Sequence, residues 1–251
     1  AEMPILSGFI IDLYWKNNMP FYENFSASQP TGAGAWLADK EALNALRAIL
    51  NVSDGARAVL EIGPGRGPFM RACDSRSLDY TCVDISWTLL KGLPDRKRIN
   101  ALVPPLPVSS GLFDVAFASN VLEHMLDFRA ASSFVEEMAR VVKPGGLVCH
   151  RVPNVMAWGM HFWNGDYTHS FATTPRNVSQ LYLDLGLKVE AWYPVTGPLV
   201  GRGARALSLA GKLIPSWVVD HGANPTSRLA KSVYSLKTTF LLGFLIIGRK
   251  A

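Results

Sequence analysis

The stretch AVLEIGPGRGPF, residues 58–69, decides the fold of this chain. It begins with an apolar run of strand type, and glycines follow at alternate positions, Gly63, Gly65 and Gly67. Glycine adopts positive φ at little cost and lets a backbone pass close to a ligand. A helix that begins after such a turn also presents unpaired N–H groups. The stretch therefore predicts a strand-to-helix turn that carries a ligand, with a plain tight turn as the alternative.

The spacing of the glycines excludes two common phosphate-binding loops. A dinucleotide-binding turn reads GxGxxG and a P-loop ends in GK followed by Ser or Thr, whereas this turn reads GPGRG. A second polar signal, Asp84, stands 19 residues beyond Gly65, where the strand-like run YTCVD ends. A carboxylate there can accept hydrogen bonds from both hydroxyls of a ribose, or it can cap a helix at ISWTLL. Together the signals favour an adenosine-containing ligand without a pyrophosphate.

Strand-like and helix-like runs alternate around this turn. Strands are predicted at 58–62, 80–84, near Ile99, 112–119 and 147–152. Helices are predicted at 38–50, directly after the glycines, and from about 128 to 142, where KPGG closes the last of them. Strict alternation of the two types predicts a parallel sheet that is covered by helices on both faces.

The C-terminal part has a different character. TTPRNVSQLYLDLG predicts a helix with Thr174 as its N-cap, Pro175 at its first position and Gly186 beyond its end. A strand, LKVEAWY, follows. Residues 195–235 are rich in Gly, Pro and Ser and contain an amphipathic run, ARALSLAGKLI, so we interpret them as a cap-like insertion. The apolar run FLLGFLIIG, residues 240–248, predicts a buried last strand.

Composition limits the classes of protein to which the chain can belong. Its 251 residues, 49% hydrophobic and 18% charged, suit one α/β domain with a substantial core. The net charge is +5, and the sequence contains no basic run longer than DRKR. A nucleic-acid partner is therefore not favoured. The apolar run 240–248 is far shorter than the ~20 residues of a membrane-spanning helix.

No secretory signal is recognisable, and Cys73, Cys82 and Cys149 form no CxxC pair. We therefore expect a cytoplasmic protein with free, buried thiols.

Four motifs in order resemble the class I S-adenosylmethionine-dependent methyltransferases. They are VLEIGPGRG, YTCVDIS, LFDVAFASNVLEHM and RVVKPGGLVCHRVPN, from about residue 58 to 154. The resemblance implies an α/β fold with a Rossmann-like, doubly wound sheet of seven strands, six parallel and an antiparallel last one, plus a small helical or irregular cap. In this family the N-terminal segment often closes over the cofactor. We accordingly expect a lid at 1–36 and the methyltransferase domain at 37–251.

The resemblance assigns eight residues to S-adenosyl-L-methionine. In chain order these are Glu61, Gly63, Gly65, Gly67, Asp84, Ile85, Asn100 and Asn120. The first four would line the methionine part, Asp84 would hold the ribose hydroxyls, and Ile85 would pack on the adenine. Asn100 stands where the family usually has an acid that meets the adenine amino group; its amide oxygen can still accept that hydrogen bond. Asn120 would lie beside the sulfonium.

Methyl transfer needs an aligned nucleophile, exclusion of water and, for a hydroxyl acceptor, removal of a proton. Glu123 and His124 follow the fourth strand, at the sheet edge where open α/β folds bind ligands. His169, in DYTHSF, should fold back over the same edge. These three are the candidate catalytic residues, although LEH can also simply orient its loop. Asp166 would polarise His169 or cap the local turn.

The same segments suggest a metal site. NVLEH together with YTHSF is similar to the pattern of small-RNA 3′-end 2′-O-methyltransferases, which hold a metal with two Glu and two His. Here the fourth position is Asn120, and an amide with one carboxylate makes a poorer site for a hard dication. We therefore expect Glu123, His124 and His169 to work without a metal.

Several further side chains have two readings. His150, in an apolar strand, is interpreted as a core residue. His161 and its aromatic neighbours in WGMHFWNGDY either wall an acceptor pocket or pack the cap. The rings of Tyr14, Trp15, Phe21 and Tyr22 pose the same choice within the lid. Arg151 and Arg176 would meet an anionic acceptor or remain solvated.

The expected function is methylation of an oxygen on a small polar acceptor, such as a sugar or a glycan end. This choice rests on the resemblance of the THSF…TP segment to methyltransferases of glycan assembly. A quinone, lipid or other aromatic acceptor is the alternative, with residues 195–235 as a hydrophobic cap and peripheral membrane contact; an RNA acceptor comes third. The rival from another class is a non-catalytic module that keeps the cofactor fold as a scaffold.

Overall fold

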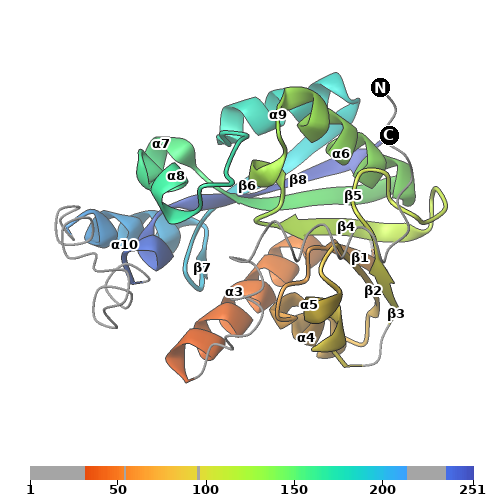
Figure 1. The fold of residues 1–251 in the computed structure, drawn as a ribbon, viewed down its shortest axis with the longest axis horizontal. Coiled ribbons are helices and arrows are strands. Elements are labelled where there is room, and N and C mark those ends of the chain that lie inside the picture. The colour runs from red at the N-terminus through yellow and green to blue at the C-terminus, as the bar shows by residue number, and fades with distance from the viewer. Residues whose placement is uncertain (1–31, 54, 95–96, 214–235) are drawn as a thin grey trace.

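The computed structural model describes residues 32–53, 55–94, 97–213 and 236–251. Its centre is an eight-stranded sheet with the order β3-β2-β1-β4-β5-β8-β6-β7 (Figure 1). The strands are β1 Ala58–Ile62, β2 Asp79–Asp84, β3 Lys97–Asn100, β4 Phe113–Ser119, β5 Val142–Pro153, β6 Leu187–Thr196, β7 Leu199–Val200 and β8 Gly243–Lys250. The predicted lid lies almost wholly outside the described residues, and so do Tyr14, Trp15, Phe21 and Tyr22.

The pairing of the strands confirms the predicted winding of the sheet. Strands β1 to β5 are joined by parallel ladders. Strand β8 is antiparallel to both β5 and β6, so β6 runs in the same direction as the parallel set. The count of seven strands is wrong by one, because β7 pairs antiparallel with the end of β6. A strand of two residues carries no periodic signal in the sequence.

Helices cover both faces of the sheet (Figure 1). Helices α3 and α4 pack with one face into a cluster around Val59, Cys82 and Phe117. Helices α6 and α9 pack with the other face into a cluster around Leu60, Ala116 and Ile246. None of the described helices is long and apolar enough to cross a membrane. The helices are α3 Ala33–Leu50, α4 Pro68–Asp74, α5 Trp87–Lys91, η1 Leu122–His124, α6 Phe128–Val141, α7 Val155–Trp158, α8 His161–Gly165, α9 Pro175–Asp184 and α10 Arg202–Lys212.

Three predicted boundaries are wrong. Helix α3 already begins at Ala33, inside the segment expected to be irregular. Strand β5 begins at Val142, ahead of KPGG, because Val142 pairs with Phe113 and the residues up to Leu147 form a bulge. The last strand begins at Gly243, because residues 236–240 are helical. In the second and third cases a tertiary pairing overrides a local signal for a helix end or a strand.

Other expectations about the core are confirmed. Helix α9 has Thr174 as its N-cap in a capping box and Pro175 at its first position. All three cysteines are free and buried. His150 is completely buried, and its Nδ1 lies 2.6 Å from the hydroxyl of Tyr182. A helix, α10, occupies most of the amphipathic run near residue 206, while residues 214–235 of the predicted insertion lie outside the described residues.

We predict that Gly248→Ala destabilises the fold by about 1–3 kcal/mol, because it overpacks the core. A Cβ at Gly248 would lie 2.6 Å from Cε2 of Tyr182. Tyr182 is completely buried and bonded to His150, so it cannot move aside. Urea denaturation measures the change. Gly203→Ala is the control, since its Cβ would make only an ordinary contact of 3.6 Å. Equal midpoints for the two variants would contradict the described packing.

Candidate functional site

The predicted ligand-binding residues gather where the strand order reverses, between β1 and β4. In open α/β sheets the ligand lies beyond the carboxyl ends of the strands at such a point. The register brings the loops together: Ile62 pairs with Val83 on one side and with Ala118 on the other. The glycine turn after β1 therefore lies between Asp84, at the end of β2, and the loop that follows β4.

The glycine turn has the backbone that its sequence predicts. Gly63, Gly65 and Gly67 have φ of +71°, +52° and +76°, values that favour glycine. A Cβ at Gly63 would lie 2.7 Å from Cγ2 of Val121, in the loop after β4. At Gly65 it would meet no atom within 4 Å. Gly63 thus lets two loops pack closely, while the backbone at Gly65 borders open space.

Asp84 is buried at the edge of this space, with an exposure of 8%. Its Oδ1 accepts a hydrogen bond of 2.7 Å from the N–H of Ser86. Burial raises the pKa of Asp84 to about 6, although hydrogen bonds from the Ser86 and Ile85 N–H groups oppose the rise. The expected alternative, that Asp84 caps the next helix, is wrong, because the hydroxyl of Ser86 is the cap of α5. Asp84 therefore does not cap α5, and its role toward a ligand stays a prediction.

Asn100 holds the backbone that follows β2. Its Nδ2 donates to the carbonyls of Asp84, at 3.0 Å, and Ile85, at 2.8 Å. The amide oxygen of Asn100 has no hydrogen bond within the described residues. This arrangement is compatible with the expected acceptor role of that oxygen, and Ile85 is half-buried beside it.

Glu61 is enclosed below the glycine turn. Its carboxyl group is 2% exposed and accepts a hydrogen bond from the hydroxyl of Tyr80 on β2. Burial raises the pKa of Glu61 to about 8, against the effect of the Tyr80 hydrogen bond. The sequence analysis missed Tyr80. Tyr80, Cys82 and Asp84 alternate along β2, so their side chains lie on one face of the strand. This spacing was the signal that could have placed Tyr80 in the site.

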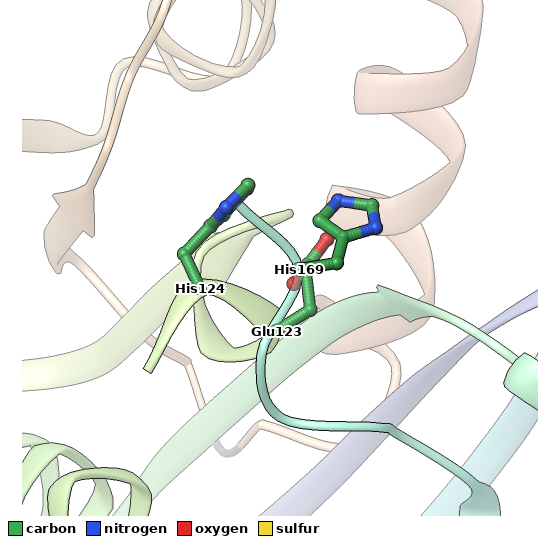
Figure 2. Close-up of side chains that lie close together, drawn as sticks. All are labelled: Glu123, His124 and His169. Carbon is green, nitrogen blue, oxygen red and sulfur yellow. The ribbon is translucent and has the colours of Figure 1, made fainter. Parts of the chain in front are cut away.

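The three candidate catalytic residues come together at the same edge of the sheet. Glu123 and His124 lie on η1, directly after β4, and His169 lies on a loop that crosses over it (Figure 2). One potential ligand atom of each residue lies within 4.8 Å of those of the other two. The ring centroids of His124 and His169 are 4.8 Å apart.

Backbone hydrogen bonds hold the two segments together. The N–H groups of Ser170 and Phe171 both donate to the carbonyl of Glu123, at 2.9 and 3.0 Å. The ring of His169 also lies against that of Phe162 on α8, with centroids 4.6 Å apart. The expectation that DYTHSF folds back over the sheet edge is therefore confirmed.

The hydrogen bonds of both imidazoles define their tautomers. His169 Nδ1 lies 2.6 Å from the carbonyl oxygen of Phe162, which can only accept, so Nδ1 carries the proton. His124 Nδ1 lies 2.8 Å from Thr168 Oγ1, whose own proton is donated to Asp166 Oδ1 at 2.6 Å. In both neutral rings the lone pair is therefore on Nε2. Thr168 is a residue that sequence analysis missed; the Asp-x-Thr spacing of a side-chain turn was its signal.

Asp166 acts on the cluster through Thr168. It accepts hydrogen bonds from both the N–H and the hydroxyl of Thr168, so it closes the local turn, as one of its two readings proposed. Burial opposes its ionisation, but these hydrogen bonds and the nearby imidazoles outweigh it and hold the pKa of Asp166 below its usual range. The charge of Asp166 opposes the burial that lowers the pKa of His169, and a chain of hydrogen bonds leads from Asp166 through Thr168 to His124.

Burial keeps the cluster neutral near pH 7. It lowers the pKa of His124 to about 4, with a further contribution from His169, and it lowers the pKa of His169. Burial also raises the pKa of Glu123 to about 8, although Arg151 opposes this. The Glu123 side chain is 1% exposed, and its Oε2 has no hydrogen-bond partner within the described residues.

The centre of the chain matches a known protein family. Residues 60–150 match a family model described as a methyltransferase domain. This part of the chain is similar to methyltransferase domains. Three curated relatives, named uncharacterized methyltransferase, come from Mycobacterium sp. strains KMS, JLS and MCS. Each is 32% identical over 131 residues, which is 49% of this chain and 50% of the relative. The chain thus spans about half the length of these relatives.

Solved structures share the fold over most of the chain. A SAM-dependent methyltransferase from Archaeoglobus fulgidus has a TM-score of 0.58 at 19% identity, covering 92% of this chain and 98% of its own. The [4+2]-cyclase SpnF has a TM-score of 0.59 at 17% identity, covering 96% and 94%. At these identities the likeness shows the fold. The resemblance of the sequence motifs to class I methyltransferases is confirmed.

Arg151 forms contacts within the protein and does not remain solvated as one of its two interpretations proposed. Its Nη2 forms an ion pair of 2.5 Å with Glu41 of α3, and its Nη1 donates to the amide oxygen of Asn120 at 2.7 Å. Arg151 is thereby an internal link between α3 and the loop after β4. Asn120 has φ of +53° and is exposed. Its expected place beside a sulfonium stays a prediction.

A cavity of about 790 Å³ lies among α7, α8 and residues of the C-terminal part. Its lining is mostly apolar, from Met156, Trp158, Met160 and Trp163, with the lysines Lys212 and Lys237. His161 belongs to the same wall, which agrees with the reading that its aromatic stretch walls a pocket.

We predict that Arg151→Met destabilises the fold by about 1–3 kcal/mol, because Glu41 and Asn120 both lose their partner. A second change, Glu41→Gln, should recover part of the loss, since it removes the unpaired charge. Chemical denaturation of both variants measures this. Arg176→Met, at an exposed position of α9, is the matched control, with a change within about 0.5 kcal/mol. A loss no larger than that of the control would contradict the linking role.

Proposed function

We propose that this protein transfers a methyl group from S-adenosyl-L-methionine. The observation that carries the proposal is the glycine turn after β1, which borders open space at Gly65 next to the buried carboxylate of Asp84. Solved structures with this fold support the cofactor. They include proteins named SAM-dependent methyltransferase and a Haemonchus contortus N-methyltransferase in complex with S-adenosylhomocysteine, at 16% identity and a TM-score of 0.56, covering 82% of this chain and 52% of its own.

The proposed contacts follow the chemistry of each group. Asp84 accepts hydrogen bonds from the two ribose hydroxyls, and Asn100 accepts one from the adenine amino group through its amide oxygen. Ile85 packs on the adenine. Gly63, Gly65 and Gly67 shape the backbone against the methionine part, and Glu61 supports them from below through its hydrogen bond with Tyr80.

We propose an oxygen of a small polar acceptor, such as a sugar or a glycan end, as the methylated atom. A hydroxyl must lose its proton as it attacks the methyl group, and a positioned base or cation promotes this. Glu123, His124 and His169 supply one carboxyl group and two neutral imidazoles at the sheet edge. Such a cluster suits a hydroxyl better than an amine, whose lone pair attacks without prior deprotonation.

The apolar cavity favours a second candidate, an acceptor with an apolar body such as a quinone or a lipid. Phe162 links the two features, since it belongs to α8 beside the cavity and contacts His169. A hydroxyl of such an acceptor would still meet the cluster. A different reaction also exists on this fold, as the cyclase SpnF shows by its name, so the assay must follow methyl transfer itself.

We predict that affinity for S-adenosyl-L-methionine falls about tenfold between pH 8 and pH 5. The pKa of Asp84 is raised to about 6, so its carboxylate is ionised above that pH and becomes protonated below it. A protonated Asp84 loses an acceptor for the ribose hydroxyls. Isothermal titration calorimetry across this range measures the effect, and Asp84→Asn should bind weakly with little pH dependence. Binding by the wild type that does not change with pH would contradict the role of Asp84, and no binding at millimolar ligand would favour the scaffold alternative.

We predict that His169→Ala lowers kcat by about 10²-fold or more with little change in affinity for S-adenosyl-L-methionine. The measurement is release of S-adenosylhomocysteine with a panel of sugar, glycan, quinone and lipid acceptors. His150→Gln is the control, because it removes a completely buried histidine outside the cluster. Its kcat shows the effect of losing a histidine that has no proposed catalytic role. Full turnover by His169→Ala with the true acceptor would refute the proposed role of the cluster.

A further inference from the structure

We propose that α7, α8 and α10 form a face that binds the surface of an anionic lipid bilayer. The three helices lie together at the end of the molecule remote from β3 (Figure 1). One cavity joins them, since residues of α7 and α8 and Lys212 of α10 all line it. The proposal rests on four properties of this face: its exposed apolar side chains, the orientation of α10, its charge and its hollow shape.

Large apolar side chains on or directly beside these helices are exposed. They are Met156, Met160, Trp163, Leu209 and Leu213, with exposed fractions between 42% and 81%. Single exposed apolar residues are normal on a protein surface, but a group of them marks a place of contact with a partner or a membrane. Trp163 has an apolar ring and a polar N–H, a combination that suits the boundary between lipid chains and water.

Helix α10 is oriented with its leucines outward. An ordinary surface helix buries its large apolar side chains and exposes its polar ones. The buried positions of α10 instead carry only small residues, Ala204, Ser208 and Gly211. A Cβ at Gly211 would lie 2.6 Å from Cβ of Phe240, so the packing of this helix requires a small residue there. Leu209 and Leu213 therefore contribute little to the core, and most of their surface is available to a partner.

The charge of this face is positive. Helices α7, α8 and α10 and residues 236–241 contain no Asp or Glu. The same segments contain four cationic residues, Arg202, Arg205, Lys212 and Lys237. Three of the four are exposed on α10 and lie on the same side of the helix as Leu209, because these positions are three or four residues apart. Cations thus surround the outward leucines.

Charge complementarity favours an anionic lipid surface over a second copy of this chain. A symmetric dimer would place the same face against itself, and its cations would then repel one another. Anionic headgroups attract Lys and Arg side chains near a membrane surface. Apolar side chains between those cations enter the boundary between headgroups and acyl chains, as they do in amphipathic helices that lie in the plane of a membrane.

The cavity favours a lipid over a protein surface. Its volume is about 790 Å³. Its wall combines the apolar side chains of Met156, Met160 and Trp163 with the lysines Lys212 and Lys237. A lipid has a flexible apolar chain and an anionic headgroup, so a single molecule provides partners for both kinds of side chain and adapts to a hollow of this shape.

Binding of this face to a bilayer would also affect access to the candidate catalytic residues. Phe162 of α8 contacts His169, so α8 connects the lipid-binding face with the cluster. An acceptor that resides in the membrane would then reach the cluster from the lipid side, and this clause rests on the proposed function with its second candidate acceptor. Membrane binding itself requires neither the cofactor nor an acceptor.

The test measures binding of the full chain to lipid vesicles by sedimentation. Vesicles of phosphatidylcholine and phosphatidylglycerol in equal parts should carry the protein into the pellet. Vesicles of phosphatidylcholine alone should bind it at least about tenfold more weakly, because they lack the negative surface potential. Binding to the anionic vesicles should also weaken as the salt concentration rises, since salt screens exposed charges.

Two double variants test the residues of this face. Arg202→Gln with Lys212→Gln should weaken binding to the anionic vesicles by about 25-fold, since each cation near such a surface contributes about fivefold. Leu209→Ser with Leu213→Ser should weaken it by more than about tenfold, because less apolar area leaves water on binding. All four side chains are exposed, so both variants should keep the fold, which circular dichroism establishes.

The matched controls remove the same residue types at exposed positions outside this face. Arg76→Gln with Lys97→Gln lowers the net charge by the same amount, and Leu112→Ser with Leu183→Ser removes two exposed leucines. Both should change binding by less than about twofold, since charges more than a Debye length away are largely screened and these leucines do not meet the lipid.

Two outcomes of these measurements overturn the proposal. The first is no binding to the anionic vesicles at low salt, or equal losses in the variants and their controls. The second is a dimer in sedimentation equilibrium that Leu209→Ser with Leu213→Ser dissociates, because a second copy of the chain would then cover this face. Since these readouts contain no methyl donor, a failure of methyl transfer would leave them unaffected.

Discussion

The backbone pairing of β1 with β2 on one side and β4 on the other is the constraint on which the site depends. The Ile62 pairings place the glycine turn, the carboxylate of Asp84 and the loop before η1 at one level of the sheet. The N–H of Gly63 extends the ladder by bonding to the Val83 carbonyl at 2.9 Å. A shift of one residue in this register would send Glu61 and Asp84 to the opposite face, where α6 packs. The proposed cofactor part of the site is thus a consequence of strand order and register.

The proposed acceptor part of the site depends on a different contact. The carbonyl of Glu123 accepts two N–H groups from the segment that carries His169, and this joins a sequence far along the chain to the loop after β4. Because the contact uses backbone atoms, it fixes the position of His169 whatever the neighbouring side chains are. The side-chain network of Asp166, Thr168 and His124 then sets the direction of the imidazoles.

Burial of ionisable groups is a common feature of both parts. Glu61, Asp84 and Glu123 all have raised pKa values, and both histidines of the cluster have lowered ones. Perturbed groups of this kind gather at functional sites, because a protein environment that disfavours charge also strengthens interactions with a bound charge. Here the positively charged sulfonium of the proposed cofactor is such a charge.

The sequence by itself determined the alternation of strands and helices, the glycine turn and the capped start of α9. These features are local, since periodicity, positive φ and capping depend on residues that are close neighbours in the chain. Only the tertiary structure decided which polar groups meet. Tyr80 reaches Glu61 across 19 residues and Thr168 reaches His124 across 44, while Arg151 turns from a surface residue into a link to α3. The same holds for β7 and for the start of β5, because a strand's partner is chosen by distant segments whose contacts leave no pattern in the local sequence.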